Sequence, residues 1–127
     1  MSPLAYTPDT NAIIYYLKDD SNAVPLLREI FAHEAPLYVS AITELELLAY
    51  SSLSAQEKAL IEEILTTISI IPLDSHIARL ASLVRRQYRL KVPDSMIAAT
   101  AIFTGSTLIT RNTRDFKRVT TLSLLKI

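Results

Sequence analysis

The sequence contains a single glycine, Gly105, and this scarcity excludes several common functional motifs. A G-x-x-x-x-G-K-[ST] phosphate-binding loop, a G-x-G-x-x-G dinucleotide-binding turn and a G-x-S-x-G nucleophile elbow each need more than one glycine. Their tight backbone geometry is not accessible to other residues. We therefore exclude all three kinds of site.

Cysteine is absent and histidine is rare. A chain without cysteine has neither a disulfide framework nor a thiolate metal site, which is typical of a cytosolic protein. The two histidines, His33 and His76, have no second ligand at metal spacing. We interpret both as surface or helix-end residues.

Long apolar runs are also missing. No stretch approaches the roughly 18 residues that a membrane-spanning helix needs, and the sequence does not start with the basic and then apolar pattern of a signal peptide. We therefore expect a cytoplasmic protein. Half of the 127 residues are hydrophobic, which is enough for a real core, and we predict a single domain over residues 1–127.

The formal net charge of zero conceals an asymmetry between the two parts of the chain. Residues 1–75 hold three basic and eleven acidic residues, a balance of −8, whereas residues 76–127 hold ten basic and two acidic residues, a balance of +8. Such asymmetry is typical of proteins with an anionic partner. Ordinary solvated helix faces would explain it equally well.

Short apolar segments alternate with helical patterns along the chain. Strands are predicted at residues 4–8, 36–40, 69–73 and 106–110 and within 119–127; helices are predicted at 11–18, 21–34, 43–53, 54–67, 74–90 and 94–105, with a polar turn or short helix at 111–118. This alternation indicates an α/β fold. We expect a three-layer α/β/α sandwich with a mostly parallel, roughly five-stranded sheet.

Capping residues predict several helix boundaries. The pairs Thr43/Glu46 and Ser54/Glu57 have the spacing of a capping box, and Asp74 is a plausible N-cap. Asp94 is predicted to open a helix that ends at Gly105.

Acidic side chains follow three of the predicted strands. In parallel α/β sheets ligands bind outside the carboxyl ends of the strands, and the acids expected at that end are Asp9, Glu44, Glu46, Asp94 and Asp115, with Asn112 beside the last. Each has an ordinary explanation as a helix cap or an ion-pair partner. Together, however, several carboxylates in one place repel one another and must share a cation or a proton. Without histidine or cysteine nearby, an all-oxygen cluster suits Mg²⁺ or Mn²⁺, which commonly act on phosphate groups.

Basic residues surround the two late acids. Asp94 is preceded by Arg85, Arg86, Arg89 and Lys91, and Asp115 is flanked by Arg111, Arg114, Lys117 and Arg118. Guanidinium groups around a carboxylate site would hold the phosphates of a phosphodiester substrate. For the 85–91 run, the exposed face of a helix is an equally good explanation.

Four segments, "TPDTNAIIYYL", "VSAITELELL", "PDSMIAATAI" and "LITRNTRDF", resemble in order and spacing the motifs of PIN-domain ribonucleases, in particular the VapC-like toxins. The resemblance implies an α/β/α sandwich whose metal-binding and catalytic acids are Asp9, Glu46, Asp94 and Asp115. The pattern Thr-x-x-Glu-Leu selects Glu46 rather than Glu44. Supporting polar positions are Asn11, Thr43 and Asn112. Because Asn112 stands where relatives often have a further acid, a second metal ion would be weakly held or absent.

The same resemblance implies a mechanism and partners. One or two Mg²⁺ or Mn²⁺ ions would activate a water that attacks the phosphorus in line with the leaving 3′ oxygen, giving 5′-phosphate and 3′-hydroxyl ends. Arg85, Arg86, Arg89, Arg111 and Arg114 are the candidates for holding RNA. VapC-like proteins usually form homodimers and bind a VapB-like antitoxin, so we expect the toxin of such a pair.

Other functions remain possible at this level. A stand-alone RNA-processing PIN nuclease would carry the same acids, and a non-cleaving PIN-like module would bind RNA or protein only. A haloacid-dehalogenase-like phosphatase needs Asp-x-Asp where this chain has Asp9-Thr-Asn11. The acid pair and the lysine of a receiver domain are not evident.

Overall fold

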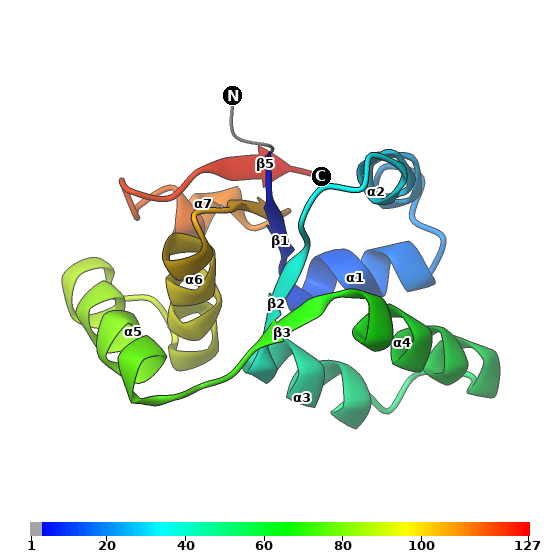
Figure 1. Cartoon of the computed structure of the whole chain (residues 1–127), viewed down its shortest axis with the longest axis horizontal. Coiled ribbons are helices and arrows are strands. Elements are labelled where there is room, and N and C mark those ends of the chain that lie inside the picture. The colour runs from blue at the N-terminus through cyan, green and yellow to red at the C-terminus, as the bar shows by residue number, and fades with distance from the viewer. Residues whose placement is uncertain (1–3) are drawn as a thin grey trace.

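The structure is a computed structural model that describes residues 4–127; residues 1–3 of the predicted domain lie outside it. Figure 1 shows a central set of strands with helices on both sides. The elements are, in chain order, β1 (Tyr6–Pro8), α1 (Thr10–Leu17), α2 (Ala23–Ala32), β2 (Tyr38–Ser40), α3 (Ala41–Ala49), α4 (Ala55–Thr67), β3 (Ser69–Ile71), α5 (Ser75–Tyr88), α6 (Val92–Thr104), β4 (Thr107–Thr110), α7 (Thr113–Phe116) and β5 (Leu124–Lys126).

All strand pairs are parallel. β4 pairs with β1 on one side and with β5 on the other, and β2 pairs with β3. A single parallel bridge between Tyr6 and Leu37 joins the two ladders, which gives the order β3-β2-β1-β4-β5. The five parallel strands agree with the sequence-based prediction, although their hydrogen bonds form a three-stranded and a two-stranded ladder.

Strand β4 shows why helices cover both faces of the sheet. Successive side chains of a strand point to opposite faces. Leu108 packs with Ile97 of α6, whereas Ile109 packs with Ala12 of α1 and Leu27 of α2. This arrangement is the three-layer α/β/α sandwich that the alternation of elements predicts.

A second part of the core lies around β2. Val39 of β2 packs with Ile13 of α1, Leu47 of α3 and Ile61 of α4, all of them at most 1% exposed. Burying a large aliphatic side chain of this kind stabilises the fold by about 1.5–3 kcal/mol. These contacts fix α1 and α3 side by side, which matters for the acids they carry.

Some predicted helix caps are confirmed and two are wrong, and the helix predicted over residues 43–53 spans Ala41–Ala49. The Ser54/Glu57 capping box forms at the start of α4, and Gly105 ends α6 in the left-handed conformation with φ of 66°. The Thr43/Glu46 capping box does not form, because Ser40 caps α3 and Thr43 lies buried inside that helix.

The predicted start of α6 is also wrong. Asp94 is not the N-cap of this helix, which begins at Val92, after Lys91 in the cap position. Pro93 explains the difference, because the fixed φ of proline and its missing N–H suit the first turn of a helix. Asp94 therefore lies within the first turn, where a negative charge interacts favourably with the helix dipole.

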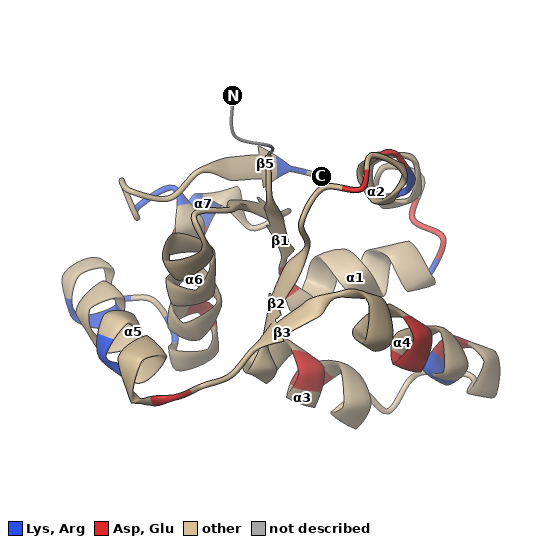
Figure 2. Cartoon of the chain, in the orientation of Figure 1, with Lys and Arg blue, Asp and Glu red and all other residues tan. Residues whose placement is uncertain are grey.

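The charge asymmetry of the sequence persists in space. Figure 2 shows Lys and Arg gathered on α5 and near α7, whereas Asp and Glu lie mainly on α3, α4 and around α2. Folding therefore does not mix the acidic and basic parts of the chain. Between residues 4 and 127, no helix combines the length and apolar character needed to cross a membrane.

Candidate metal centre

Asp9 lies at the point where the strand order reverses. From β1 the chain continues to β2 and β3 on one side, and it returns to β4 and β5 on the other. Ligand sites of parallel α/β sheets are found at such switch points. Asp9 follows β1 directly, its backbone N–H donates to the Ile109 carbonyl of β4 (3.0 Å), and its side chain is 6% exposed.

Both carboxylate oxygens of Asp9 accept hydrogen bonds. The backbone N–H of Ala12 donates to Oδ1 (2.7 Å), which makes Asp9 the N-cap of α1, and the hydroxyl of Thr110 donates to Oδ2 (2.6 Å). Thr110 is the last residue of β4 and is fully buried. Asp9 is thus held at the boundary between β1 and β4 in one orientation.

Glu46 lies beside the start of α1. Its Oε1 accepts a hydrogen bond from the hydroxyl of Thr10 (2.6 Å), and the oxygen of that hydroxyl lies 3.0 Å from Oγ1 of Thr43. Strand β2 and helix α3 thus bring Glu46 to the residue that follows Asp9. Glu46, not Glu44, is the acid whose charge acts on Asp9.

The charges of Asp94 and Glu46 act on the carboxyl group of Asp9. Burial is the largest cause that raises the pKa of Asp9, and the charges of Asp94 and Glu46 raise it further. Burial also raises the pKa of Asp94, followed by the charges of Asp115 and Glu46, against a lowering effect of Lys91. The negative charges of Asp94, in the first turn of α6, and of Glu46, in the middle of α3, therefore repel that of Asp9.

Asp115 has a different environment. The side-chain amide of Asn112 donates to Oδ2 (3.1 Å), and the guanidinium of Arg118 lies 3.0 Å from Oδ1. These contacts, the Asn112 hydrogen bond first, lower the pKa of Asp115. Its charge is thus already compensated, whereas in the described chain Asp9, Glu46 and Asp94 form no ion pair.

The donor set fits a hard divalent cation in its chemistry. Carboxylates that repel one another and form no ion pair within residues 4–127 would be stabilised by an ion that prefers oxygen ligands. Within residues 4–127, however, no three acidic or histidine side chains are close enough to hold one ion between them. Ion binding would therefore draw these carboxylates together, and the ligand set remains a prediction.

The candidate RNA-binding arginines fall into two groups. Arg111 is engaged within the fold, because its guanidinium lies 2.7 Å from Asp20 and 4.0 Å from the centre of the Tyr15 ring. Arg85 donates to the carbonyl of Leu90 (2.6 Å).

Four of the five candidate arginines lie on the surface. Arg85, Arg86, Arg89 and Arg114 are exposed. Asn11, one of the predicted supporting residues, is also exposed on α1. These side chains are available for contacts with another molecule, and Arg111 in its present pairing is not.

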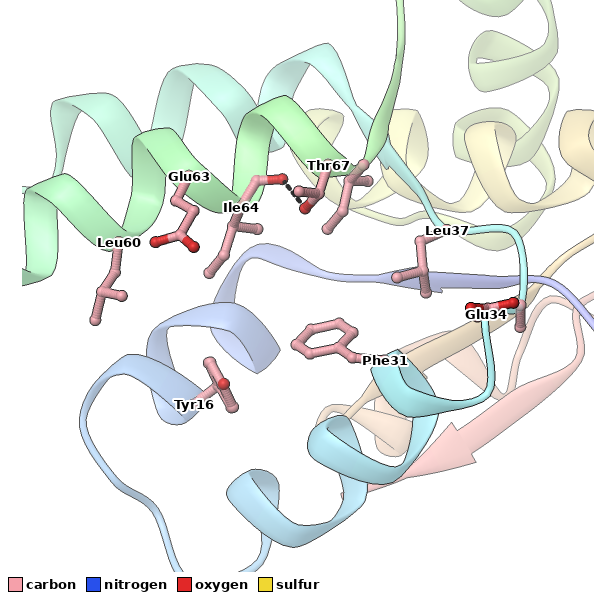
Figure 3. A pocket seen from close by; sticks show the side chains of 10 residues that line it. Tyr16, Phe31, Glu34, Leu37, Leu60, Glu63, Ile64 and Thr67 are labelled. Atoms are coloured by element: carbon pink, nitrogen blue, oxygen red, sulfur yellow. Dashed lines mark hydrogen bonds between the residues drawn. The ribbon is translucent and has the colours of Figure 1, made fainter.

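A groove of about 540 Å³ lies elsewhere, between α1, α2 and α4. Figure 3 shows Tyr16, Phe31, Leu60 and Ile64 around it, with Glu34 and Glu63 also at its wall. None of the four candidate metal-binding acids lines this groove. Its lining is mainly apolar, and Glu34 and Glu63 are its charged residues.

Two residues that contact the acids were not predicted from the sequence. Thr10 donates to Glu46, and Thr110 donates to Asp9. The available signal was position alone: Thr10 directly follows Asp9, and Thr110 ends the segment "TLIT" that forms β4. Threonine is common at such places, so the pattern alone does not distinguish these two residues.

Comparison with known proteins agrees with the resemblance. The PIN domain family model matches residues 6–122. The tRNA(fMet)-specific endonuclease VapC of Shigella flexneri is 30% identical over 125 residues, which cover 91% of this chain and 92% of that protein.

Solved structures give the same result. A toxin–antitoxin complex from Klebsiella pneumoniae contains a chain with 28% identity and a TM-score of 0.77, covering 94% of this chain and 95% of that one. The fold also matches VapBC2 of Rickettsia felis bound to a promoter DNA fragment, with a TM-score of 0.81, 24% identity and coverage of 98% and 99%. The extent of the family match and the shared fold establish that this chain belongs to the PIN-domain family and is similar to VapC proteins.

Proposed function

We propose that this protein is an endoribonuclease that depends on Mg²⁺ or Mn²⁺. The observation that supports the proposal is that Asp9, at the switch point of the sheet, has its pKa raised by the charges of Asp94 and Glu46, while none of the three acids forms an ion pair within the described residues. The similarity to an endonuclease that acts on tRNA(fMet) supports RNA as the substrate. An RNA substrate also favours the cytoplasm as the place of action.

The acidic residues have different roles at the proposed metal site. Asp9, Glu46 and Asp94 would hold the ion, with Asp115 nearby but paired to Arg118. When bound, such an ion lowers the pKa of a coordinated water and neutralises charge on the scissile phosphate. Asp9 is fixed by Ala12 and Thr110, so its oxygens do not reorient freely when substrate arrives.

Binding of RNA is assigned to the exposed basic residues. Arg86 and Arg89 near the end of α5 and Arg114 on α7 are exposed, and Figure 2 shows Lys and Arg along α5 and near α7. Contacts between arginines and phosphates supply affinity but no sequence information. The identity of the RNA target would therefore depend on the shape of the surface around the acids.

The direct test is cleavage of RNA by the purified protein. We expect cleavage in Mg²⁺ or Mn²⁺, none in EDTA, and none by the Asp94→Asn variant, whose circular dichroism spectrum should match the parent. Asp74→Asn, at the cap of α5 and outside the site, is the matched control and should cleave. Cleavage by Asp94→Asn at the parent rate would refute the assignment. RNA binding without cleavage by the parent would instead support the non-cleaving module.

We also propose a VapB-like antitoxin as protein partner. Similar solved structures are described as toxin–antitoxin or VapBC complexes, which supports this partner. The groove between α1, α2 and α4 is an apolar surface that such a partner would bury, and the carboxylates of Glu34 and Glu63 favour a basic segment. A stand-alone nuclease would have no such partner.

A homodimer is the third part of the proposal. Leu45 and Leu48 are 59% and 54% exposed on α3, and a spacing of three residues places them on one face of the helix. An exposed pair of leucines would be covered if two copies associate.

A further inference from the structure

The hydroxyl of Thr10 makes contacts to which the proposed function assigns no role. Thr10 is the first residue of α1 and is 8% exposed. Its hydroxyl donates to Oε1 of Glu46 (2.6 Å), a residue 36 positions away on α3, and its oxygen lies 3.0 Å from Oγ1 of Thr43, also on α3. These contacts connect the first turn of α1 to Thr43 and Glu46 of α3, and the two helices follow two different strands.

The two side chains in this contact differ in flexibility, and this difference determines which of them orients the other. Glutamate has three rotatable side-chain bonds, and no ion pair restrains Glu46 in the part of the chain that the structure describes. Threonine is branched at Cβ and has a single side-chain torsion to its hydroxyl oxygen, which limits the directions in which that hydroxyl can point. Thr43 is fully buried and completes the surroundings of that hydroxyl. The stiffer residue therefore determines where the more flexible carboxylate lies.

The contact engages only one carboxylate oxygen. Thr10 donates to Oε1, and among the described residues no hydrogen bond or ion pair engages Oε2. Thr10 also directly follows Asp9, whose carboxylate is held by Ala12 and Thr110. The relative placement of Asp9 and Glu46 is thus determined by two adjacent residues at the start of α1.

We propose that Thr10 is a positioning residue that holds Glu46 next to Asp9 for binding of the divalent cation. The inference rests on the proposed metal-dependent function. Hydrogen bonds from neighbouring groups to ligating carboxylates orient them, and their loss typically weakens metal affinity about 10–100-fold.

The test is the affinity for Mn²⁺ alone, measured by calorimetry or by the electron paramagnetic resonance of free Mn²⁺. Thr10→Val removes the hydroxyl and keeps the shape of the side chain. We expect it to bind Mn²⁺ about 10–100-fold more weakly than the parent, and Thr10→Ser, which retains the hydroxyl, to restore binding. Thr10→Ala is the second variant without a hydroxyl, and its smaller side chain keeps the test available if valine prevents folding.

The matched control is Thr100→Val. Thr100 is also fully buried, but its hydroxyl donates to the carbonyl of Met96 within α6. This variant should bind Mn²⁺ like the parent. A general loss of packing would weaken both valine variants, whereas loss of positioning weakens only the variant at residue 10.

The outcomes separate this inference from the proposed function. If the parent binds Mn²⁺, Asp94→Asn does not, and folded Thr10→Val or Thr10→Ala binds with parent or higher affinity, the positioning role is wrong and the metal site stands. If Thr10→Ser binds as weakly as Thr10→Val, the hydroxyl is not the cause and the inference also fails. If the parent itself does not bind Mn²⁺, the proposed function fails first.

Discussion

Arg111 and Asp20 form an ion pair between the end of β4 and the loop after α1, with 2.7 Å between Nη2 and Oδ2. The hydrogen bond from Arg111 is the main cause that lowers the pKa of Asp20 to about 2. The same guanidinium stacks on Tyr15 of α1. This pairing ties the strand that carries Thr110 to the helix that begins after Asp9.

The first prediction concerns the arginines. The Asp94→Asn background separates binding from cleavage. In this background, Arg86→Gln and Arg114→Gln should each weaken RNA binding. Each should also reduce the magnitude of the negative slope of log affinity against log salt concentration by about 0.7. Arg111→Gln should leave that slope unchanged and lower the melting temperature. Adding Asp20→Asn to Arg111→Gln should cause little further loss, because the pair is already broken. If Arg111→Gln instead reduced the magnitude of this slope, Arg111 would bind RNA.

The second prediction concerns pH. The pKa of Asp94 in the folded protein lies above its ordinary value of 3.8, so the folded state binds more protons than the unfolded state in the window above pH 3.8. The stability of the metal-free protein therefore falls as pH rises through that window, and the loss persists at neutral pH. Asn at this position is neutral throughout. In EDTA, Asp94→Asn should gain stability relative to the parent as pH rises from about 3.8 to 7.

Melting temperatures of both proteins across this pH range test the second prediction. Carboxylates with lowered pKa, such as Asp20 and Asp115, act in the opposite direction but are present in both proteins. Addition of Mn²⁺ should stabilise the parent and not the variant, because only a bound cation offsets the repulsion. A stability difference that does not change with pH would contradict this account of Asp94.

The third prediction concerns the groove between α1, α2 and α4. Leu60→Glu places a charge at its apolar wall, next to Glu63, and should abolish binding of a VapB-like antitoxin, the protein partner proposed above. Cleavage of RNA by Leu60→Glu alone should be unaffected, because Leu60 lies outside the acid site. Leu83→Glu is the matched control, since Leu83 is 58% exposed on α5 and does not line the groove. Calorimetric titration measures both variants, and parent-like binding by Leu60→Glu would exclude this groove as the docking surface.

Much of the fold was predictable because it follows from local patterns. Short apolar runs predicted all five strands, and the position of Asp9 after the first of them predicted its place at the end of the sheet. Errors arose where local signals compete. Thr43 and Glu46 have capping-box spacing, but Ser40 lies at the end of β2 and caps the helix first.

The candidate site was predictable only in outline. The sequence predicted which acids would gather, because the ends of parallel strands meet at one edge, and that ligand set stays a prediction. It could not indicate that Thr110 donates to Asp9 across 101 residues, or that Arg118 compensates Asp115 while Asp9 and Glu46 remain without a cationic partner in the described chain. Local patterns in a sequence encode secondary structure, whereas the partner of each polar side chain depends on which distant segments packing brings together. For this reason, only the tertiary structure shows that Thr10 donates a hydrogen bond to Glu46 and that Arg111 forms an ion pair with Asp20.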